Sequence, residues 1–525
     1  HLLKFGYDKQ DRQSRKTTAP VGGHNYTYVT KQPGDIIQGN NGTLWTNTTG
    51  RPVDLVEDRI FIGGGSFGSD LTAWYIEDQY QPTEQLTLNI GVRQDHFVNT
   101  GATGIDFVDL KTDVAPRLGF SYDPTGAGES KIFGTWGRYY LPVPNNTNYR
   151  AASGVDDTTT HYYFTGFDPV TGAPTGATPV NGSVANSQVV NSTSSAMPSV
   201  ALFQAQEADP FYKEEWVLGY ETQITEEYYG SIRGTYRFVG AALDDFCGPV
   251  ANQHFCTLVN PGKPGSWYSD DDEDNIPDPG SLTTYSPEDM ALPEAENEYV
   301  ALQSQVGFRG EALRWDLIYT WSRSTGNFEG AVKSDINQAD AGITQDFDFP
   351  ALMDGADGYQ ANDRRHVFKF FGSYDITEDL VVGVNSTLSS GRPLSMFGQG
   401  YPSSDSKLYG SYGDTFYLVT GCPDTNANGK CDTAERQFRK VPRGTAGRTP
   451  WNFNIDLSAR YNFEISGVEM GVSVNVFNIL NIQESTSQNE HYEARRSAGT
   501  YNPWYGADYT WQTPRYVRLG LDGRF

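Results

Sequence analysis

The sequence predicts an all-β fold of antiparallel strands, and three observations support this prediction. Segments of about ten residues alternate apolar and polar side chains along the chain. Short turns alternate with long polar insertions. No run of about 18 apolar residues occurs, which excludes a transmembrane helix but not a membrane strand, whose apolar signal is diluted by half. Because lipid requires every backbone polar group to be paired within the protein, we expect a transmembrane antiparallel β-barrel.

The first strand patterns lie in the N-terminal half, although those before residue 62 are weak. His1–Asp8 (HLLKFGYD) already has the character of a strand. Further on, an apolar side faces a polar side: Leu86, Leu88, Ile90 and Val92 oppose Thr87, Asn89 and Arg93. The same holds for Ile232, Tyr236 and Phe238 against Arg233, Thr235 and Arg237. Each segment suits lipid on one side and water on the other.

The C-terminal strands are the clearest. Phe453, Ile455, Leu457, Ala459, Tyr461 and Phe463 oppose polar residues that include Asp456 and Arg460. Val468, Met470, Val472, Val474 and Val476 oppose Glu469, Ser473 and Asn475. In the last segment, Arg515 to Phe525, Val517, Leu519 and Leu521 oppose Arg518, Asp522 and Arg524. The polar sides predict lumen-facing positions at Arg93, Arg233, Arg237, Asp456 and Arg460.

The connections differ in length. Short links occur at 123–130, 311–312, 377–379 and 464–467, and long loops at about 142–209, 240–298, 325–364 and 391–451. Outer-membrane barrels place short turns on the periplasmic side and long loops outside. We count about 14 to 16 candidate strands and expect residues 1–525 to form one barrel domain.

A soluble β-sandwich, propeller or solenoid is the alternative, because alternation alone shows only that a strand is half buried. The sequence has no repeat of about 40 residues, which argues against a propeller. The polar sides carry Arg and Asp, which a dry core would not accept. Aromatic residues also gather at expected strand ends, as membrane interfaces favour, namely Trp74, Tyr75, Tyr80, Trp136, Tyr139, Tyr140, Trp315, Trp321, Trp504, Tyr505 and Trp511. Both points favour the membrane barrel.

The net charge and the cysteines limit which partners and which cellular compartment can be expected. The net charge of −26 would repel the phosphates of nucleic acid. We expect divalent cations to bind the acidic loops. The alternative is that these loops only keep the surface soluble. The four cysteines form two local pairs of equal spacing, Cys247 with Cys256 and Cys422 with Cys431. We expect two disulfides and an oxidising compartment, since neither pair has the spacing of a zinc site.

The sharpest motif is Asp424–Glu435 (DTNANGKCDTAE). Oxygen ligands fall at positions 1, 3, 5, 9 and 12, with a turn glycine at position 6 and a carbonyl at position 7. The ligands are Asp424, Asn426, Asn428, Asp432, Glu435 and the carbonyl of Lys430. The pattern predicts a Ca²⁺ site that the Cys422–Cys431 pair would staple. The alternative is an Asx-rich turn without an ion.

A second acidic run, SDDDEDNIPD at 269–278, offers carboxylates at alternating positions: Asp270, Asp272, Asp274 and Asp278. It departs from the calcium pattern because Asn275 replaces the turn glycine and Ser281 occupies position 12. Calcium and a solvated charge run both remain open here. Such ions would stiffen extracellular loops.

We expect no enzyme activity. The seven histidines are scattered, and neither HExxH nor GxSxG occurs. A catalytic triad assembled from distant residues stays open, because its members need not be close in sequence.

Several segments resemble the barrel of TonB-dependent outer-membrane receptors, above all the Oar-like branch. They are residues 70–98, 115–124 (APRLGFSYDP), 132–140 (IFGTWGRYY), 215–221 (EWVLGYE), 319–330 (YTWSRSTGNFEG), 362–366 (NDRRH) and 475–481 (NVFNILN). The resemblance implies a bacterial outer-membrane receptor with a 22-stranded barrel, an N-terminal plug and a periplasmic box that engages TonB to drive uptake.

The sequence departs from that family in two respects. No plug-like segment or TonB box precedes His1, and fewer than 22 strands are recognised. We expect the chain to be the C-terminal part of a longer polypeptide, with a reduced relative as the alternative. A second functional reading is a surface scaffold for adhesion or secretion, with calcium-stiffened loops and surface proteins or lipoproteins as partners. It is supported by four unusually long loops.

Overall fold

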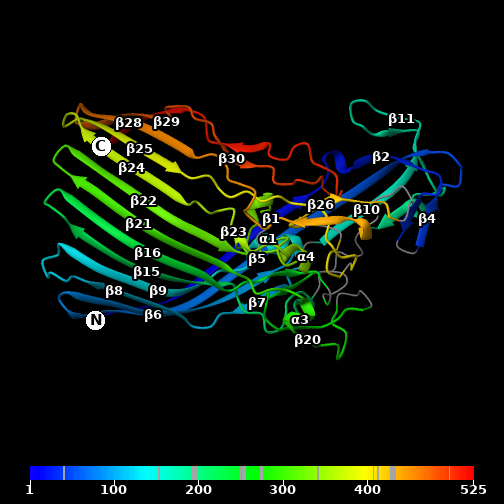
Figure 1. The fold of residues 1–525 in the computed structure, drawn as a ribbon, viewed down its shortest axis with the longest axis horizontal. Coiled ribbons are helices and arrows are strands. Elements are labelled where there is room, and N and C mark those ends of the chain that lie inside the picture. The colour runs from blue at the N-terminus through cyan, green and yellow to red at the C-terminus, as the bar shows by residue number, and fades with distance from the viewer. Residues whose placement is uncertain are drawn as a thin grey trace.

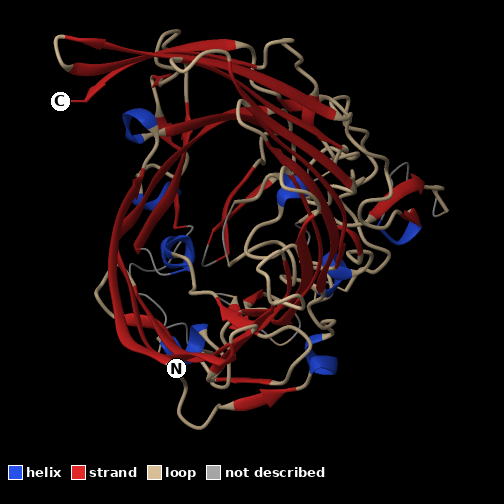
Figure 2. Ribbon diagram, turned by 90° about the vertical axis from the view of Figure 1, so that its left-hand side faces the viewer, coloured by secondary structure: helices blue, strands red, loops and turns tan. Residues whose placement is uncertain are grey.

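The computed structural model describes residues 1–525 except 40–41, 152–153, 191–198, 249, 251–255, 272–275, 340–341, 406, 411–412, 426–432, 496 and 525. Its main feature is one large antiparallel sheet that curves round on itself (Figures 1 and 2). The long strands are β1 (Leu2–Thr18), β5 (Val53–Thr83), β6 (Leu86–Thr100), β8 (Ala115–Tyr122), β9 (Ser130–Tyr140), β15 (Tyr212–Gln223), β16 (Tyr228–Ala241), β21 (Asn297–Arg309), β22 (Leu313–Gly326), β24 (His366–Asp375), β25 (Leu380–Ser389), β28 (Asn452–Ile465), β29 (Val468–Phe477) and β32 (Tyr516–Arg524).

Shorter elements extend these strands or lie between them. The short strands are β2 (Asn25–Lys31), β3 (Ile36–Gly39), β4 (Gly42–Thr46), β7 (Asp106–Lys111), β10 (Gly154–Tyr163), β11 (Gly166–Phe167), β12 (Pro174–Thr175), β13 (Thr178–Pro179), β14 (Gln188–Val190), β17 (Asp244–Phe246), β18 (Thr257–Val259), β19 (Gly265–Trp267), β20 (Thr283–Tyr285), β23 (Gly358–Tyr359), β26 (Tyr417–Gly421), β27 (Gln437–Lys440), β30 (Ser485–Gln488) and β31 (Asp508–Trp511). The helices are α1 (Asn145–Ala151), α2 (Val200–Phe203), α3 (Pro287–Met290) and α4 (Pro350–Met353), with 3-10 turns η1 (Val21–Gly23), η2 (Ala185–Ser187), η3 (Ser334–Ile336) and η4 (Thr433–Glu435). None of the helices in the described part of the chain has the length and apolarity needed to span a membrane.

Each long strand pairs with the next in chain order, as expected when short turns connect antiparallel neighbours. The order is β1, β5, β6, β8, β9, β15, β16, β21, β22, β24, β25, β28, β29 and β32. These fourteen strands, which follow one another round a 20-stranded sheet that also includes β2, β7, β10, β13, β14 and β23, fall within the predicted 14 to 16. Within the described residues, β32 pairs only with β29 and so forms one edge of the sheet. The other edge is formed by β1 and β2, both of which pair only with β5.

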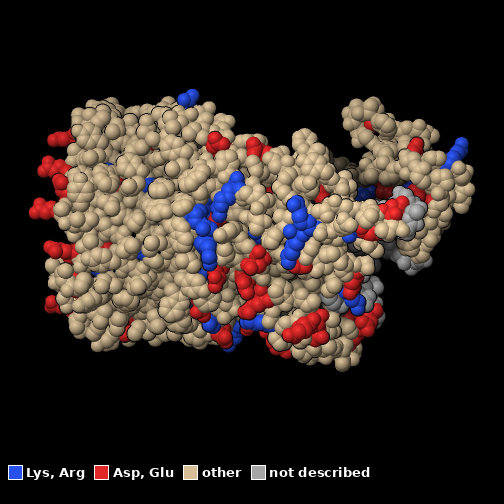
Figure 3. All heavy atoms as spheres, in the orientation of Figure 1, with Lys and Arg blue, Asp and Glu red and all other residues tan. Residues whose placement is uncertain are grey.

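The two faces of the sheet differ as the alternation predicts. On β22, Leu317 pairs with Val306 and Phe370, whereas the next residue, Ile318, pairs with Gln305 and Lys369. Figure 3 shows the resulting outer surface: a broad belt almost free of charged side chains lies between acidic turns at one end and charged loops at the other. This belt has the character of a lipid-facing surface.

Adjacent aromatic residues cannot both face lipid, and this limits the predicted aromatic girdle. Trp74 pairs with Tyr7 and lies on the outer face, whereas Tyr75 pairs with Arg93 on the inner face. Trp504 and Tyr505 lie in the segment between β29 and β32 rather than at the end of a spanning strand. The girdle is therefore thinner than the sequence suggests.

The long connections gather at one end of the sheet and the short turns at the other (Figure 1). We call the segments 141–211, 242–296, 327–365, 390–451 and 478–515 the loop cap. The cap segments contribute most of the two hydrophobic clusters of the described chain, the larger of which is centred on Phe246, Trp267, Phe328, Phe347 and Phe416. A sheet with lipid on one face and water on the other has no core of its own, so the cap contains much of the close-packed interior.

Candidate functional site: inner wall and loop cap

The inner wall of the sheet carries the residues predicted to face the lumen. Arg93, Arg233, Arg237, Arg460 and Asp456 all occupy the face opposite the uncharged belt. Arg233 and Arg237 contact residues of adjacent strands, whereas Arg93 and Arg460 also reach carboxylates two strands away, because all of these side chains share one face. The alternation therefore identified the polar face correctly.

Most of these side chains are paired. Arg460 makes a two-pronged contact with Asp522, with Nη1–Oδ1 and Nη2–Oδ2 distances of 2.9 and 2.8 Å. Arg93 Nη2 lies 2.9 Å from Asp95 Oδ1 and 3.3 Å from Asp8 Oδ2. Other pairs on this wall are Arg237 with Glu215, Arg309 with Asp316, Arg314 with Asp375, and Lys131 with Glu221.

These ion pairs are partly or fully exposed, so water screens them and they contribute little to stability. Their importance is chemical, since they line the wall with hydrated charges of both signs. A recess of about 410 Å³ lies on this wall beside Arg93 and Arg117. Within the recess, the guanidinium of Arg117 lies 5.0 Å from the ring centre of Tyr139. The wall is suited to the passage or temporary holding of polar groups.

A buried ionic cluster holds the centre of the loop cap. Lys333 Nζ lies 2.6 Å from Asp346 Oδ1, and both side chains are 1% exposed. Arg443 Nη2 lies 2.9 Å from the same oxygen, and its Nε lies 3.3 Å from Asp335 Oδ2. Burial alone would raise the pKa of Asp346, but Arg443 and Lys333 together lower it. The cluster therefore connects segment 327–365 with segment 390–451 through charged groups.

A second buried pair adds the segment that precedes the last strand. Arg392 Nη2 lies 2.5 Å from Glu490 Oε1, and the amide of Ser395 donates to the same carboxylate. Burial raises the pKa of Glu490 to about 8, although Arg392 opposes this shift. Glu493 accepts hydrogen bonds from the amides of Gln399 and Val419 at 2.8 and 2.7 Å. Three cap segments are thus locked together.

The remaining cap segments are tied in by neutral and charged hydrogen bonds. Asp244 accepts from the amide and the hydroxyl of Thr344 at 2.9 and 2.8 Å. Asn260 Nδ2 donates to the carbonyls of Asp209 and Ala242. Sequence reasoning missed all of these groups, because they are isolated residues far apart in the chain. The one sequence feature that could have indicated a packed cap is that charged and apolar residues occur together within the long loops.

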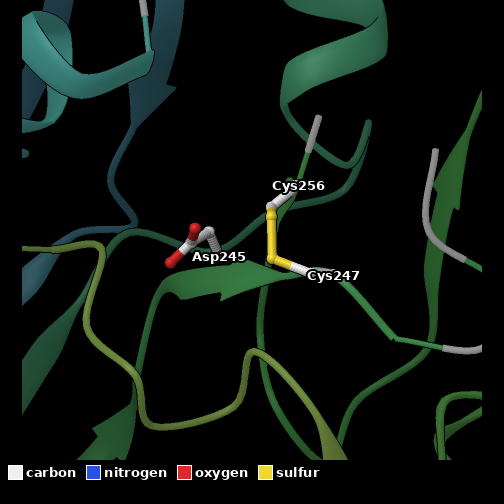
Figure 4. A group of neighbouring side chains, drawn as sticks. All are labelled: Asp245, Cys247 and Cys256. Atoms are coloured by element: carbon white, nitrogen blue, oxygen red, sulfur yellow. A yellow bond between two sulfur atoms is a disulfide. The ribbon is translucent and has the colours of Figure 1, made fainter. Parts of the chain in front are cut away.

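One disulfide, between Cys247 and Cys256, is formed as the spacing predicts. Cys422 is also disulfide-bonded, and Cys431 lies outside the described residues. Asp245 is close to the bridged sulfur atoms, so that one ligand atom from each of the three residues lies within 4.8 Å of the others (Figure 4). Because metals bind the thiolate, bridged cysteines are not ligands here.

The predicted calcium residues are only partly described. Asp424 and Glu435 are described, whereas Asn426, Asn428, Lys430 and Asp432 lie outside the described residues. Glu435 Oε1 accepts a 2.7 Å hydrogen bond from the amide of Thr425, so the two ends of this motif meet.

In the second motif, Asp270 and Asp278 are described, and Asp272 and Asp274 are not. Asp278 Oδ2 accepts from the amide of Asp271 at 2.8 Å, and its own amide donates to the carbonyl of Ser269 at 3.0 Å. The loop therefore closes through Asp278.

Comparison with known proteins decides the family. Residues 97–507 match a family model described as "Outer membrane beta barrel domain". The chain belongs to the outer-membrane β-barrel family. Residues 3–187 also match a model described as "TonB dependent receptor-like, beta-barrel". These matches and the relative below confirm the resemblance to TonB-dependent receptors and the bacterial outer membrane as the location.

A curated relative and several solved structures are similar to this outer-membrane barrel. The TonB-dependent transporter Oar of Myxococcus xanthus is 25% identical over 443 residues, which are 80% of this chain and 36% of that protein. The siderophore receptor PiuA of Acinetobacter baumannii is 11% identical with a TM-score of 0.43, covering 99% of this chain and 56% of that one. The outer-membrane transporter YddB of Escherichia coli is 10% identical with a TM-score of 0.45, covering 99% and 54%. The chain thus spans about a third of the curated relative and about half of these structures.

Proposed function

We propose that this chain is the C-terminal part of the barrel of an outer-membrane TonB-dependent receptor that takes up a substrate through a plugged lumen. The observation that carries the proposal is the match of residues 3–187 to the TonB-dependent receptor barrel, on a sheet with an uncharged outer belt and a charged inner wall. The proposal assigns it no catalytic role.

The free edges of the sheet support the placement within a longer barrel. In a membrane, lipid cannot hydrogen-bond the backbone N–H and C=O groups along the free side of an edge strand. These groups must therefore be paired within the protein. Here the edges are β1, which pairs with β5, and β32, which pairs with β29. In our proposal, further strands of the same polypeptide pair with both edges, and its N-terminal plug fills the lumen.

In this receptor the loop cap captures the substrate and the inner wall carries it. TonB, driven by the proton-motive force, displaces the plug so that the substrate passes along the charged wall. The wall's exposed ion pairs exchange readily with polar groups, because each contributes little on its own. The cap, by contrast, is held by buried pairs and retains its shape during capture.

The test begins with the complete natural polypeptide. We expect it to contain a plug and a TonB box, and we expect the purified protein to bind the periplasmic domain of TonB. A matched variant lacking only the box should not bind. A complete polypeptide without either element, or binding that does not depend on the box, would contradict the proposal.

A surface scaffold is a second candidate, and the shared hydrophobic cluster of the cap favours it. Segments from four different connections pack around Phe246, Phe328, Phe347 and Phe416, forming a body larger than a simple gate requires. Its partners would be surface proteins or lipoproteins. Loss of TonB distinguishes the two, because a scaffold keeps its surface partners in a TonB deletion strain whereas a transporter loses uptake.

We also propose that Ca²⁺ binds residues 424–435 and, as a second site, residues 270–278. The spacing of oxygen ligands supports the first site, and the contact between Glu435 and Thr425 brings the ends of the motif together. In this role the ions stiffen loops that already lie in the cap.

Limited proteolysis with and without a chelator tests the calcium proposal. Chelation should speed cleavage between residues 422 and 435 while the barrel stays intact, and added Ca²⁺ but not Mg²⁺ should restore protection. An Asp424→Asn, Glu435→Gln variant should be insensitive to chelator. Equal cleavage of the parent protein in both conditions would contradict calcium binding.

A further inference from the structure

The recess on the inner wall has glycines in its floor. It lies across β5, β6, β8 and β9 and has a volume of about 410 Å³. A side-chain carbon added at Gly91 or Gly119 would meet other atoms only at 3.5 Å or more, and none of the nearest atoms belongs to an aromatic ring. At Gly137 on the same wall, such a carbon would lie 3.0–3.2 Å from atoms of Tyr139. The floor is therefore clear of rings beside a glycine that a tyrosine covers.

Two tyrosines bound the recess on opposite sides. Tyr75 belongs to β5 and Tyr139 to β9, with β6 and β8 between them. The ring of Tyr75 lies over Gly6, where an added carbon would meet its atoms at 2.6–2.7 Å. A tyrosine offers an apolar ring and a hydroxyl group. A ligand ring of moderate size fits the space between these two side chains.

Opposite charges stand on the two sides of the floor without meeting. Gly91 pairs with Glu77 on β5 and with Arg117 on β8, so the Cα atoms of the two charged residues are two strand spacings, or about 10 Å, apart. Among the described residues, the nearest cation to the Glu77 carboxylate is Lys4, at 4.0 Å from Nζ to Oε1. Asn89 also lines the recess. The gap between the two charges is polar at both ends.

The cationic side of the recess lacks a countercharge. Within the described residues, no carboxylate oxygen lies within 4.0 Å of Arg117 or of Lys213, which pairs with Tyr139. The neighbouring Arg93 has two carboxylate partners and Arg237 has one. Arg117 lies instead against the ring of Tyr139, with its guanidinium 5.0 Å from the ring centre. An anion is the group that this part of the wall can still accept.

The other side of the recess can bind hydroxyl groups. The Glu77 carboxylate accepts hydrogen bonds, the Asn89 amide donates and accepts, and the Thr135 hydroxyl does both. Asn89 and Thr135 flank Gly119, because that glycine pairs with both of them. The recess thus combines a cation for an acidic group with several partners for hydroxyl groups around a flat floor.

We propose that this recess binds an acidic sugar residue of the transported substrate. Arg117 would hold the carboxylate through two parallel hydrogen bonds, while Glu77, Asn89 and Thr135 bind ring hydroxyls. A neutral sugar leaves Arg117 without a countercharge, and a simple carboxylate lacks the hydroxyls that Glu77 needs. The inference names the substrate class of the receptor and therefore rests on the proposed function.

The test is isothermal titration calorimetry of the detergent-solubilised complete polypeptide with three probes. Trigalacturonate has acidic sugar rings, its trimethyl ester has the same rings without charge, and tricarballylate has carboxylates without a ring. We expect trigalacturonate to bind tightest and each of the other two to bind at least about tenfold more weakly, because each lacks one set of contacts. Equal affinity for the ester or for tricarballylate would overturn the proposal. So would the absence of binding by every probe, because the recess would then be covered in the complete polypeptide.

Variants locate the site. Arg117→Gln should weaken trigalacturonate binding at least about tenfold, and Arg117→Lys should recover part of the affinity. Gly119→Val should also weaken it, because the added methyl groups fill the floor while β-branched residues suit a strand. Arg15→Gln is the control, since it removes an exposed arginine of β1 outside the recess. It should leave the affinity unchanged, and circular dichroism checks that each variant is folded.

The same preparations separate this inference from the proposed function. Equal affinity of the parent and Arg117→Gln, with binding to the periplasmic domain of TonB retained, would overturn the sugar site alone. Loss of box-dependent TonB binding in the parent would contradict the receptor, whatever the recess binds.

Discussion

At the residue scale, charged groups have two different roles that depend on burial. On the inner wall, pairs such as Arg314 with Asp375 are partly exposed and exchange with water. In the cap, Lys333, Asp346 and Arg443 are almost fully buried, and each depends on the others for neutralisation. Removing one partner therefore has a small effect at the wall and a large effect in the cap.

Asp346→Asn should destabilise the loop cap by about 3–5 kcal/mol, because it leaves Lys333 buried without a countercharge and Arg443 with Asp335 alone. Urea denaturation followed by cap-specific hydrogen exchange measures this. Asp375→Asn, which breaks an exposed pair with Arg314, is the matched control and should cost less than about 1 kcal/mol. Equal effects of the two variants would mean that the buried cluster is not what holds the cap.

The raised pKa of Glu490 predicts how cap stability depends on pH. An unfolded glutamic acid titrates near about 4.3, whereas burial raises the folded pKa to about 8, so the folded state holds its proton more tightly. This contribution to stability is fully present below the unfolded pKa and is lost as pH rises through the folded one. Protection of the amides of Ser395 and Phe397 against hydrogen exchange, corrected for the intrinsic exchange rate, should fall between about pH 4.3 and 8.

Glu490→Gln cannot titrate and should lose that pH dependence while keeping an acceptor for Arg392. The comparison isolates Glu490 from the other acidic groups of the cap. A Gln variant with the same pH profile as the parent would assign the dependence to another group.

At the element scale, alternation decided most of what could be predicted. Strands such as β28 and β29 have unbroken apolar faces, and their bounds follow from sequence. The tertiary contacts of the cap did not, because Lys333, Asp346 and Glu490 carry no local pattern and meet only when distant loops fold together. Segment 478–515 was also missed as a long loop, since its aromatic residues resembled those of strand ends.

The assignment of faces can be tested with two adjacent positions on β22. Leu317→Arg places a charge on the lipid-facing side and should destabilise the barrel by about 2–4 kcal/mol if the position lies near mid-membrane. Ile318→Arg places the same charge on the inner wall, between Gln305 and Lys369, and should cost about 1 kcal/mol or less, from the like charge opposite it. Folding titrations into lipid vesicles measure both. A reversed order would mean that inner and outer faces have been exchanged.

At the scale of the whole molecule, the sheet joins a belt made for lipid to a cap made like a soluble protein. The belt could be predicted from period-two alternation. The cap could not, because it depends on contacts between residues far apart in the sequence. The carboxylate pattern at 424–435 predicted a metal site without indicating that its ends, Asp424 and Glu435, belong to the loop cap. The alternating pattern predicted the membrane location better than it predicted the structure of the loops. Apolar belts repeat along the sequence, whereas the cores of loops do not.

The edge strands give the last prediction. If further strands complete the barrel, the backbone amides of β1 and β32 that face away from β5 and β29 are hydrogen-bonded in the complete polypeptide. Their hydrogen exchange should then be as slow as that of the central strand β21, and faster in the chain 1–525 alone. β21 is the internal control because it has partners on both sides, β16 and β22. Equally fast exchange at both edges of the complete protein would show that this sheet stays open in the membrane.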